Sequence, residues 1–233
     1  MSASTLAVIP ARGGSRGIAR KNLTPLAGRP LIAWTIAAAR GARGITRTIV
    51  STDDAEIAAV AREHGAETPF LRPAEISGAD IHAVAAPLHA LAWWREHEGC
   101  EPSRIVMLLP TSPLRRTADI DGALDLFDRS GAPAVISVVE LDKQLPHLRR
   151  LVSGRLEPVL PLANANVQRQ DLEPLYALNG SIYVSTPAAL VAGGTFHLPG
   201  AIGFPMLPRF SVDINSPDDL LLAEFYLSQI PCP

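Results

Sequence analysis

The chain has 233 residues, of which 47% are hydrophobic and 19% are charged, and its formal net charge at pH 7 is −2. These values predict one ordered α/β domain over residues 1–233 and argue against a nucleic-acid partner, which requires a basic surface. We expect no membrane span, because no stretch approaches the roughly 20 apolar residues that cross a bilayer. Cys100 and Cys232 lack metal-type spacing and predict unpaired thiols. With no secretory leader pattern at the start, the expected location is the cytoplasm.

The first predicted element is a buried strand at residues 6–9, followed by a glycine-rich loop that carries four cations in ten residues: Arg12, Arg16, Arg20 and Lys21. Glycine lets backbone amides face a ligand closely, and amides together with guanidinium groups suit a polyphosphate. The loop would lie at the carboxyl end of the strand, where open α/β sheets bind ligands. We interpret it as a cradle for a nucleoside triphosphate, with a solvated turn as the alternative. Neither the P-loop pattern nor G-x-G-x-x-G is present.

Strands and helices then alternate along the chain. Helices are predicted at 30–43, 55–64, 81–98 and 117–129, and strands at 46–50, 104–109 and 134–139. This alternation predicts a doubly wound, mostly parallel sheet with right-handed crossovers. Asp53 or Asp54, after the strand at 46–50, could hold a metal, but capping of the next helix is the simpler interpretation.

Three histidines, His82, His89 and His97, are spaced along the helix predicted at 81–98. Without carboxylate or thiol companions, a solvated or core-edge position is favoured over a metal site. The alternation stops at 140–178, where prolines and short alternating stretches predict a protruding hairpin-like arm or a subunit contact.

The last part of the chain returns to regular structure. Residues 179–184 are predicted as a turn leading into a strand, and a further strand is predicted to end at Asp213. A final helix is expected to follow, with Ser216 as its N-cap and Pro217 at its first position.

Several separated segments resemble the acylneuraminate cytidylyltransferases, the CMP-sialic acid synthetases, over nearly the whole chain. The matching segments are 9–22, 51–54, 70–75, 110–115, Arg169 and Gln170 with Tyr176, Asn179 and Gly180, and 213–215. The resemblance implies a Rossmann-like nucleotidyltransferase sheet and transfer of CMP from CTP to the anomeric hydroxyl of a nonulosonic acid, with Mg²⁺ and release of pyrophosphate. It also implies a homodimer in which the arm at 140–178 reaches the partner's site.

The resemblance further implies roles for individual residues. The triphosphate would be held by Arg12, Gly13, Gly14, Ser15 and Lys21, the cytosine and ribose by Asn22 and Arg72, the sugar acid by Arg169 and Tyr176, and the metal by Asp213. Fixed cations and a divalent ion would stabilise the charge that develops on pyrophosphate, so Arg12 and Lys21 are candidate catalytic residues. The attacking hydroxyl must lose a proton, and Asp213, or a water on its metal, is the candidate base. Arg169 could instead form a salt bridge in a dimer interface.

Three positions depart from the family pattern. Leu109 replaces a glutamine expected to contact the acceptor, Asn215 replaces the second aspartate of a metal-binding pair, and the segment 76–80 is one residue longer. The amide oxygen of Asn215 could still coordinate a metal. The alternatives are therefore a cytidylyltransferase for another ulosonic or small acid, an enzyme for a sugar phosphate that would use Arg115 and Arg116, and a nucleotide-binding protein without turnover.

Overall fold

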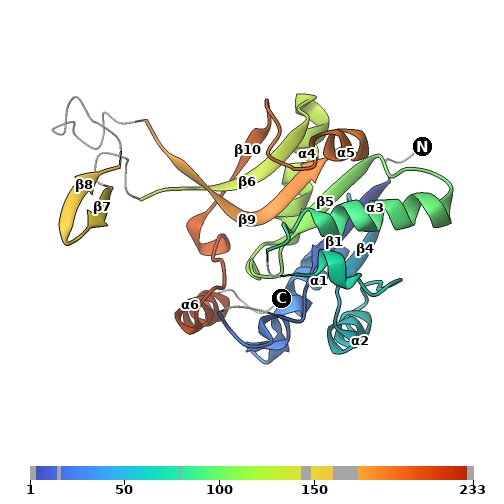
Figure 1. The fold of residues 1–233 in the computed structure, drawn as a ribbon, viewed down its shortest axis with the longest axis horizontal. Helices are drawn as coiled ribbons and strands as arrows, with labels where there is room; N and C mark the ends of the chain where they lie inside the picture. The colour runs from blue at the N-terminus through green and yellow to red at the C-terminus, as the bar shows by residue number, and fades with distance from the viewer. Residues whose placement is uncertain (1–3, 15–16, 79, 143–147, 160–172, 230–233) are drawn as a thin grey trace.

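The protein is built around a six-stranded sheet, shown by a computed structural model that describes residues 4–14, 17–78, 80–142, 148–159 and 173–229. The strand order is β10-β6-β9-β5-β1-β4 (Figure 1). The strands are β1 (Thr5–Pro10), β4 (Arg47–Ser51), β5 (Arg104–Leu108), β6 (Ala134–Glu140), β9 (Tyr176–Ser185) and β10 (Ile202–Met206). Neighbouring strands are parallel, except that β9 runs antiparallel to both β5 and β6. The predicted mostly parallel α/β sheet is therefore confirmed.

Helices cover both faces of the sheet. They are α1 (Leu31–Gly41), α2 (Ala55–Glu63), α3 (Ala85–Glu98), α4 (Thr117–Ser130) and α5 (Pro187–Gly193). A further helix, α6 (Pro217–Ser228), packs in a separate hydrophobic cluster with Leu26 and Leu31. Short 3-10 helices lie at Lys21–Leu23, Ala74–Ile76 and Pro208–Phe210. Among the described residues, no helix is long and apolar enough to cross a membrane.

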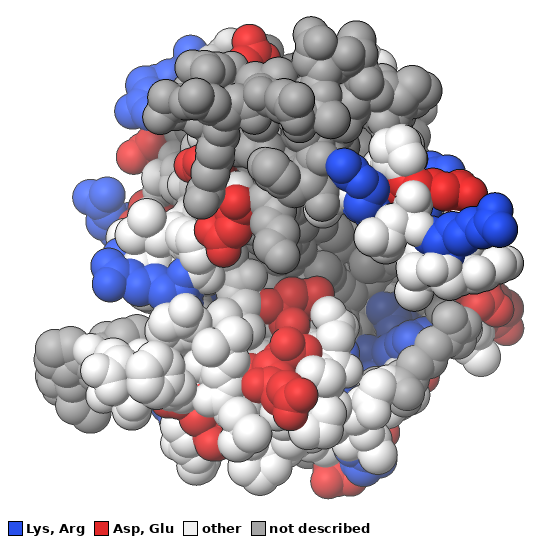
Figure 2. All heavy atoms as spheres, turned by 90° about the vertical axis from the view of Figure 1, so that its left-hand side faces the viewer, with Lys and Arg blue, Asp and Glu red and all other residues white. Residues whose placement is uncertain are grey.

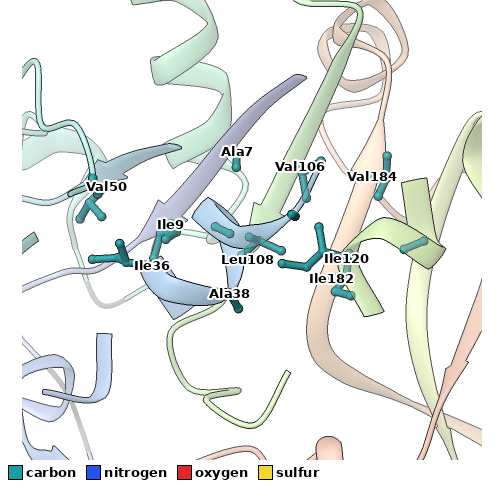
Figure 3. Close-up of a cluster of buried hydrophobic side chains, with 14 of the residues drawn as sticks. Ala7, Ile9, Ile36, Ala38, Val50, Val106, Leu108, Ile120, Ile182 and Val184 are labelled. Carbon is teal, nitrogen blue, oxygen red and sulfur yellow. The ribbon is translucent and has the colours of Figure 1, made fainter. Parts of the chain in front are cut away.

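The two faces of the sheet bury two separate hydrophobic clusters, because successive side chains of a strand point to opposite faces. Ala7 and Ile9 of β1 belong to the cluster that packs against α1, α2 and α4, part of which is shown in Figure 3. Leu6 and Val8 belong to the cluster that packs against α3 and α5. This division explains why the run at residues 6–9 is continuously apolar and why the sheet is doubly wound.

Capping residues fix where several helices begin. Asp54 caps α2 by accepting hydrogen bonds from the N–H groups of Glu56 and Ile57, so its predicted capping role is confirmed. Ser216 caps α6, and Pro217 occupies the first turn as predicted. These caps hold the turn after β4 and the segment before α6 in defined positions.

Three sequence predictions are wrong in detail. The helix predicted at 81–98 begins at Ala85, and residues 81–84 form turns before it. Residues 179–184 do not begin with a turn, because β9 runs continuously from Tyr176; Gly180 adopts φ +71° there, where the pairing with β6 shifts register. No strand ends at Asp213, which lies in an irregular segment before α6.

A two-stranded hairpin stands away from the sheet. Strands β6 and β9 continue their pairing to Glu140 and Tyr176, beyond which β7 (Arg149–Val152) and β8 (Arg155–Pro158) form the hairpin (Figure 1). A second small ribbon, β2 (Pro25–Leu26) with β3 (Arg29–Pro30), lies before α1. Residues 143–147 and 160–172 of the predicted arm lie outside the described residues.

Candidate active site

The glycine-rich loop after β1 is tied to the turn that follows β4, the neighbouring strand. The N–H of Gly13 donates to Asp53 Oδ1 at 2.9 Å, and the same oxygen lies 3.9 Å from Nη2 of Arg72. Arg72 is buried and donates from Nε to Ser77 Oγ at 3.1 Å. Arg12 reaches the same segment by donating to the carbonyl of Gly78 at 3.4 Å. Asp53 therefore positions the loop and Arg72 together at one edge of the sheet.

The end of the loop is tied to the segment before α6. Asn22 is buried and donates to the carbonyl of Arg12 at 3.0 Å, which closes the loop. Lys21 donates from Nζ to the carbonyl of Ile214 at 2.6 Å and to Oδ1 of Asn215 at 3.3 Å. Asn215 in turn donates from Nδ2 to Asp213 Oδ2 at 2.7 Å. The loop and the segment 213–215, far apart in sequence, thus form one wall.

The surroundings of Lys21 shift the pKa of its ammonium group in two opposite directions. Burial lowers the pKa of its ammonium group, and the positive charge of Arg12 lowers it further, whereas the carboxylates of Asp213 and Asp219 raise it. The balance is a lowered pKa. A partly desolvated ammonium group interacts more strongly with an anion than one in bulk water does.

A cavity of about 380 Å³ opens beside this wall. Its lining residues are Pro10, Arg12, Gly14, Gly17, Lys21, Asn22, Arg72, Ile76, Ser77, Gly78, Ile81, His82, Ala83, Leu109, Pro110, Thr111 and Asn215. The cavity lies at the carboxyl ends of β1 and β5, the expected position for a ligand in an α/β sheet. Arg12, Lys21 and Arg72 therefore line one cavity, together with glycines of the loop.

The other candidate residues of the loop are placed differently. Gly13 directs its N–H to the exposed carboxylate of Asp53. Arg20 pairs with Glu56 at 2.7 Å and Asp54 at 3.3 Å, at the start of α2. Ser15 and Arg16 lie outside the described residues.

A second cavity, of about 500 Å³, adjoins the first and shares His82, Ala83 and Leu109 with it. Its other lining residues are Val84, Met107, Tyr183, Gly194, Thr195, Phe196 and His197. The wall is largely apolar, with imidazole and hydroxyl groups among the aliphatic and aromatic side chains. Burial raises the pKa of Tyr183, and the negative charge of Asp213 raises it further. Asp213 therefore acts electrostatically on Lys21 in one cavity and on Tyr183 in the other.

Sequence reasoning missed much of the second cavity. The loop that supplies Thr195, Phe196 and His197 follows a short helix and carries no periodic pattern or motif. Tyr183 lies in the apolar part of β9, and no motif in the sequence marks it as a site residue. Tyr176, predicted to contact the sugar acid, is 47% exposed at the base of the hairpin, outside the linings of both cavities. Arg169 lies outside the described residues.

Arg115 and Arg116 are engaged within the protein. Arg115 is 3% exposed and donates to the carbonyl of Ser181 at 2.6 Å and to that of Leu109 at 3.4 Å. Arg116 pairs with Asp119 at 2.6 Å, and its guanidinium carbon lies 3.9 Å from the ring centroid of Phe210. Arg115 thus fixes the backbone behind Leu109, and Arg116 fixes the start of α4.

The histidines of the α3 region do not act as a group. His89 packs edge-on against Phe70 at 4.5 Å, and burial lowers the pKa of its imidazole. His97 stacks on Trp93 at 4.6 Å, whereas His82 lines both cavities. Within the described ranges, no group of three or more His, Cys, Asp or Glu side chains is placed to hold a metal ion.

Comparison with known proteins agrees with this geometry. The model of the cytidylyltransferase family matches residues 6–139, more than half of the chain. The chain belongs to the cytidylyltransferase family. This cytidylyltransferase is 33% identical over 231 residues to the CMP-N,N'-diacetyllegionaminic acid synthase of Legionella pneumophila, with 94% of each chain covered. It is 28% identical to the pseudaminic acid cytidylyltransferase of Campylobacter jejuni, again with 94% of each covered.

Other relatives show the limits of the match. The N-acylneuraminate cytidylyltransferase of Streptococcus agalactiae is 29% identical over 219 residues, but this cytidylyltransferase spans only 51% of that protein. Among solved structures, the CMP:2-keto-3-deoxy-manno-octonic acid synthetase complexed with CTP aligns with a TM-score of 0.69 at 16% identity, covering 97% of this chain and 99% of that chain. That likeness establishes the shared fold.

Proposed function

We propose that this cytidylyltransferase transfers CMP from CTP to the anomeric hydroxyl of a nonulosonic acid and releases pyrophosphate. The observation that carries the proposal is the pair of adjoining cavities, one cationic and one largely apolar, on either side of Leu109. A transferase needs two substrate sites that meet where the bond forms. The family match and the names of the relatives support the same reaction.

The cationic cavity is proposed to bind CTP. Arg12 and Lys21 would hold the triphosphate together with the glycine-rich loop, and Asn22 and Arg72 would contact the nucleoside. Pyrophosphate gains negative charge as it departs, and cations fixed in advance stabilise that charge without reorganising. The hydrogen bonds that tie Arg72, Gly13 and Lys21 to neighbouring segments supply this preorganisation.

Magnesium is the proposed cofactor, and the chemistry of the donor set fits it. Within the described part of the chain, Asp213 uses Oδ2 to accept from Asn215, and no hydrogen bond engages its Oδ1. Mg²⁺ is commonly held by one or two carboxylates with waters and substrate phosphates, so Asp213 would hold it. When bound, the ion would neutralise phosphate charge and lower the pKa of a coordinated hydroxyl or water. The charge of Asp213 acts on Lys21 of the first cavity and on Tyr183 of the second, and we propose that its carboxylate accepts the proton of the attacking hydroxyl.

The apolar cavity is proposed to bind the acceptor acid. Met107, Leu109 and Phe196 provide surface for methyl or acyl groups, while Thr195 and His197 offer hydrogen-bonding atoms. A sugar phosphate would require cations for its phosphate, but Arg115 and Arg116 are both engaged in structural contacts. The site therefore favours an acylated ulosonic acid over a sugar phosphate.

We further propose a cytoplasmic homodimer formed through the arm. Leu151 and Leu156 on the hairpin are each 72% exposed, and burial against a second copy would remove this apolar surface from water. The face seen from the arm side intersperses acidic and basic side chains, unlike a continuous nucleic-acid-binding surface (Figure 2).

Leu151→Glu is expected to convert a dimer to a monomer in sedimentation velocity. Leu207→Glu, which changes another exposed leucine outside the hairpin, is the control. A monomeric wild-type protein would contradict the dimer.

The reaction is tested by pyrophosphate release from CTP and Mg²⁺ with a panel of acceptors. The panel contains N-acetylneuraminic acid, a diacylated deoxy nonulosonic acid, an eight-carbon ulosonic acid and a sugar phosphate. Release with a nonulosonic acid supports the proposal. Release only with the eight-carbon acid or the sugar phosphate would overturn it, and CTP binding without release from any acceptor would favour a binding protein.

Leu109→Gln is expected to change acceptor preference. An amide placed on an apolar substrate surface loses hydrogen bonds, which costs about 1–3 kcal/mol, so kcat/KM for a diacylated deoxy acid should fall by about 5- to 150-fold. The kcat/KM for an acceptor with a hydroxyl group at that position should rise relative to that for the diacylated deoxy acid. The ratio of the two kcat/KM values is the measurement, with Leu207→Gln as the exposed control. An unchanged ratio would place the acceptor away from Leu109.

A further inference from the structure

The segment 213–215 joins the two proposed catalytic groups, Lys21 and Asp213, through a single side chain. The amide of Asn215 accepts a hydrogen bond from Lys21 Nζ with Oδ1, at 3.3 Å, and donates one to Asp213 Oδ2 with Nδ2, at 2.7 Å. An amide has both an acceptor and a donor end, which allows it to contact an ammonium group and a carboxylate at the same time.

We propose that Asn215 is a positioning residue that bridges Lys21 and Asp213, and that Asp213 is therefore the one carboxylate of this segment that holds the divalent ion. The assignment of the ion to Asp213 rests on the proposed function, whereas the hydrogen-bonded bridge through Asn215 does not. An aspartate at 215 would accept from Lys21 but would face Asp213 with a second negative charge. The asparagine keeps both neighbours in place without a metal.

The backbone around Asn215 is held independently of its side chain. Its N–H donates to Asp219 Oδ2 at 2.9 Å, and the N–H of Ile214 donates to the carbonyl of Thr111 at 2.8 Å. A Cβ atom on Gly17 would lie 2.3 Å from the carbonyl oxygen of Asn215, so the glycine-rich loop lies directly against this backbone. With the backbone fixed on these sides, the amide is directed between Lys21 and Asp213.

The contacts argue against Asn215 as a direct metal ligand. Its only amide oxygen faces the ammonium group of Lys21, and a cation bound at that oxygen would lie beside another positive charge. Asp213 has a second carboxylate oxygen for the ion, and CTP phosphates and water can complete an octahedral shell. The ion can therefore be bound by Asp213, phosphates and water, without the amide oxygen of Asn215.

The bridge is tested first without metal or nucleotide. Thermal midpoints are measured in EDTA for the wild type, Asn215→Ala, Asp213→Ala and the double variant. If the two side chains interact, the double variant should lose less than the sum of the single losses, because the second substitution removes no further bond. Strictly additive losses would overturn the bridge.

The ion is tested with Mn²⁺ as the probe, by following free Mn²⁺ with electron paramagnetic resonance in the presence of CTP. Asn215→Asp is expected to bind Mn²⁺ roughly tenfold more tightly than the wild type, since affinity rises with ligand charge, and Asn215→Ala should stay within about threefold. Asp218→Asn, which changes an exposed charge in the first turn of α6, is the control.

Two results would overturn the assignment of the ion. One is equal Mn²⁺ affinity for wild type and Asn215→Asp, and the other is an Asn215→Ala variant as weak as Asp213→Ala, which would make the amide a ligand. Failure of the wild type to bind CTP at all would overturn the proposed function instead, and the metal-free measurement would still decide the bridge.

Discussion

Lys21→Met is expected to lower kcat/KM for CTP by about 10²–10³-fold, the range seen when one preorganised donor to a developing charge is removed. Lys21 lines the cationic cavity and is held by the carbonyl of Ile214, so its ammonium group is oriented before substrate arrives. Its partial burial reduces solvent screening, which strengthens its attraction to the triphosphate. Methionine keeps an unbranched side chain of similar length, so the loss reports on charge more than on packing.

The kinetic measurement needs a cation outside the cavity for comparison. Arg43, whose side chain is 85% exposed and contacts Asp121 at 3.4 Å, provides it as Arg43→Met. Calorimetric titration with CTP separates binding from turnover, since Lys21 should contribute to both the ground state and the departing pyrophosphate. If Lys21→Met keeps kcat/KM within about threefold of the wild type, the assignment of the triphosphate to this wall is wrong.

The sequence predicts the elements that depend on continuous burial. β1 is apolar after Thr5 and β5 after Arg104 because both of their faces are covered, and the apolar run at 105–108 is typical of a strand buried in this way. The sequence does not predict β10, because it contains Gly203 and Pro205 and, among the described strands, pairs with β6 alone at the sheet edge. The antiparallel direction of β9 also escaped prediction, since an apolar run carries no information about its direction.

The candidate site likewise contains residues that the local sequence predicts and residues that it does not. Arg12 and Lys21 belong to the glycine-rich loop after β1, and the carboxyl end of a strand predicts the location of that loop, whereas Leu109 was identified only through the resemblance. Phe196 and His197 reach the second cavity from a loop after α5, a helix that the sequence did not predict. The hydrogen bond from Lys21 to the carbonyl of Ile214 joins residues 193 positions apart, and no local pattern encodes such a contact.

Gly17→Ala is expected to weaken CTP binding and turnover by about 10²-fold, although it removes no charge and no hydrogen-bonding group. The added Cβ would lie 2.3 Å from the carbonyl oxygen of Asn215 and 3.5 Å from its carbonyl carbon, both backbone atoms. Asp219 and Thr111 hold the backbone on the far side of the contact, so the glycine-rich loop is the part that must move. A small displacement of that loop moves it away from the segment 213–215 and changes the cavity that it lines.

A matched glycine distinguishes this effect from a general loss of stability. In Gly44→Ala the new Cβ would lie 2.6 Å from Cδ1 of Leu124, the tip of a core side chain that can rotate away, outside the linings of both cavities. That variant should lower the thermal midpoint while keeping the wild-type affinity for CTP in calorimetric titration. Gly17 lies in an exposed loop, so its variant should show the opposite pattern, with a nearly unchanged thermal midpoint and weak CTP binding. Wild-type CTP affinity in Gly17→Ala would mean that contact between the loop and the segment 213–215 is not needed to form the triphosphate site.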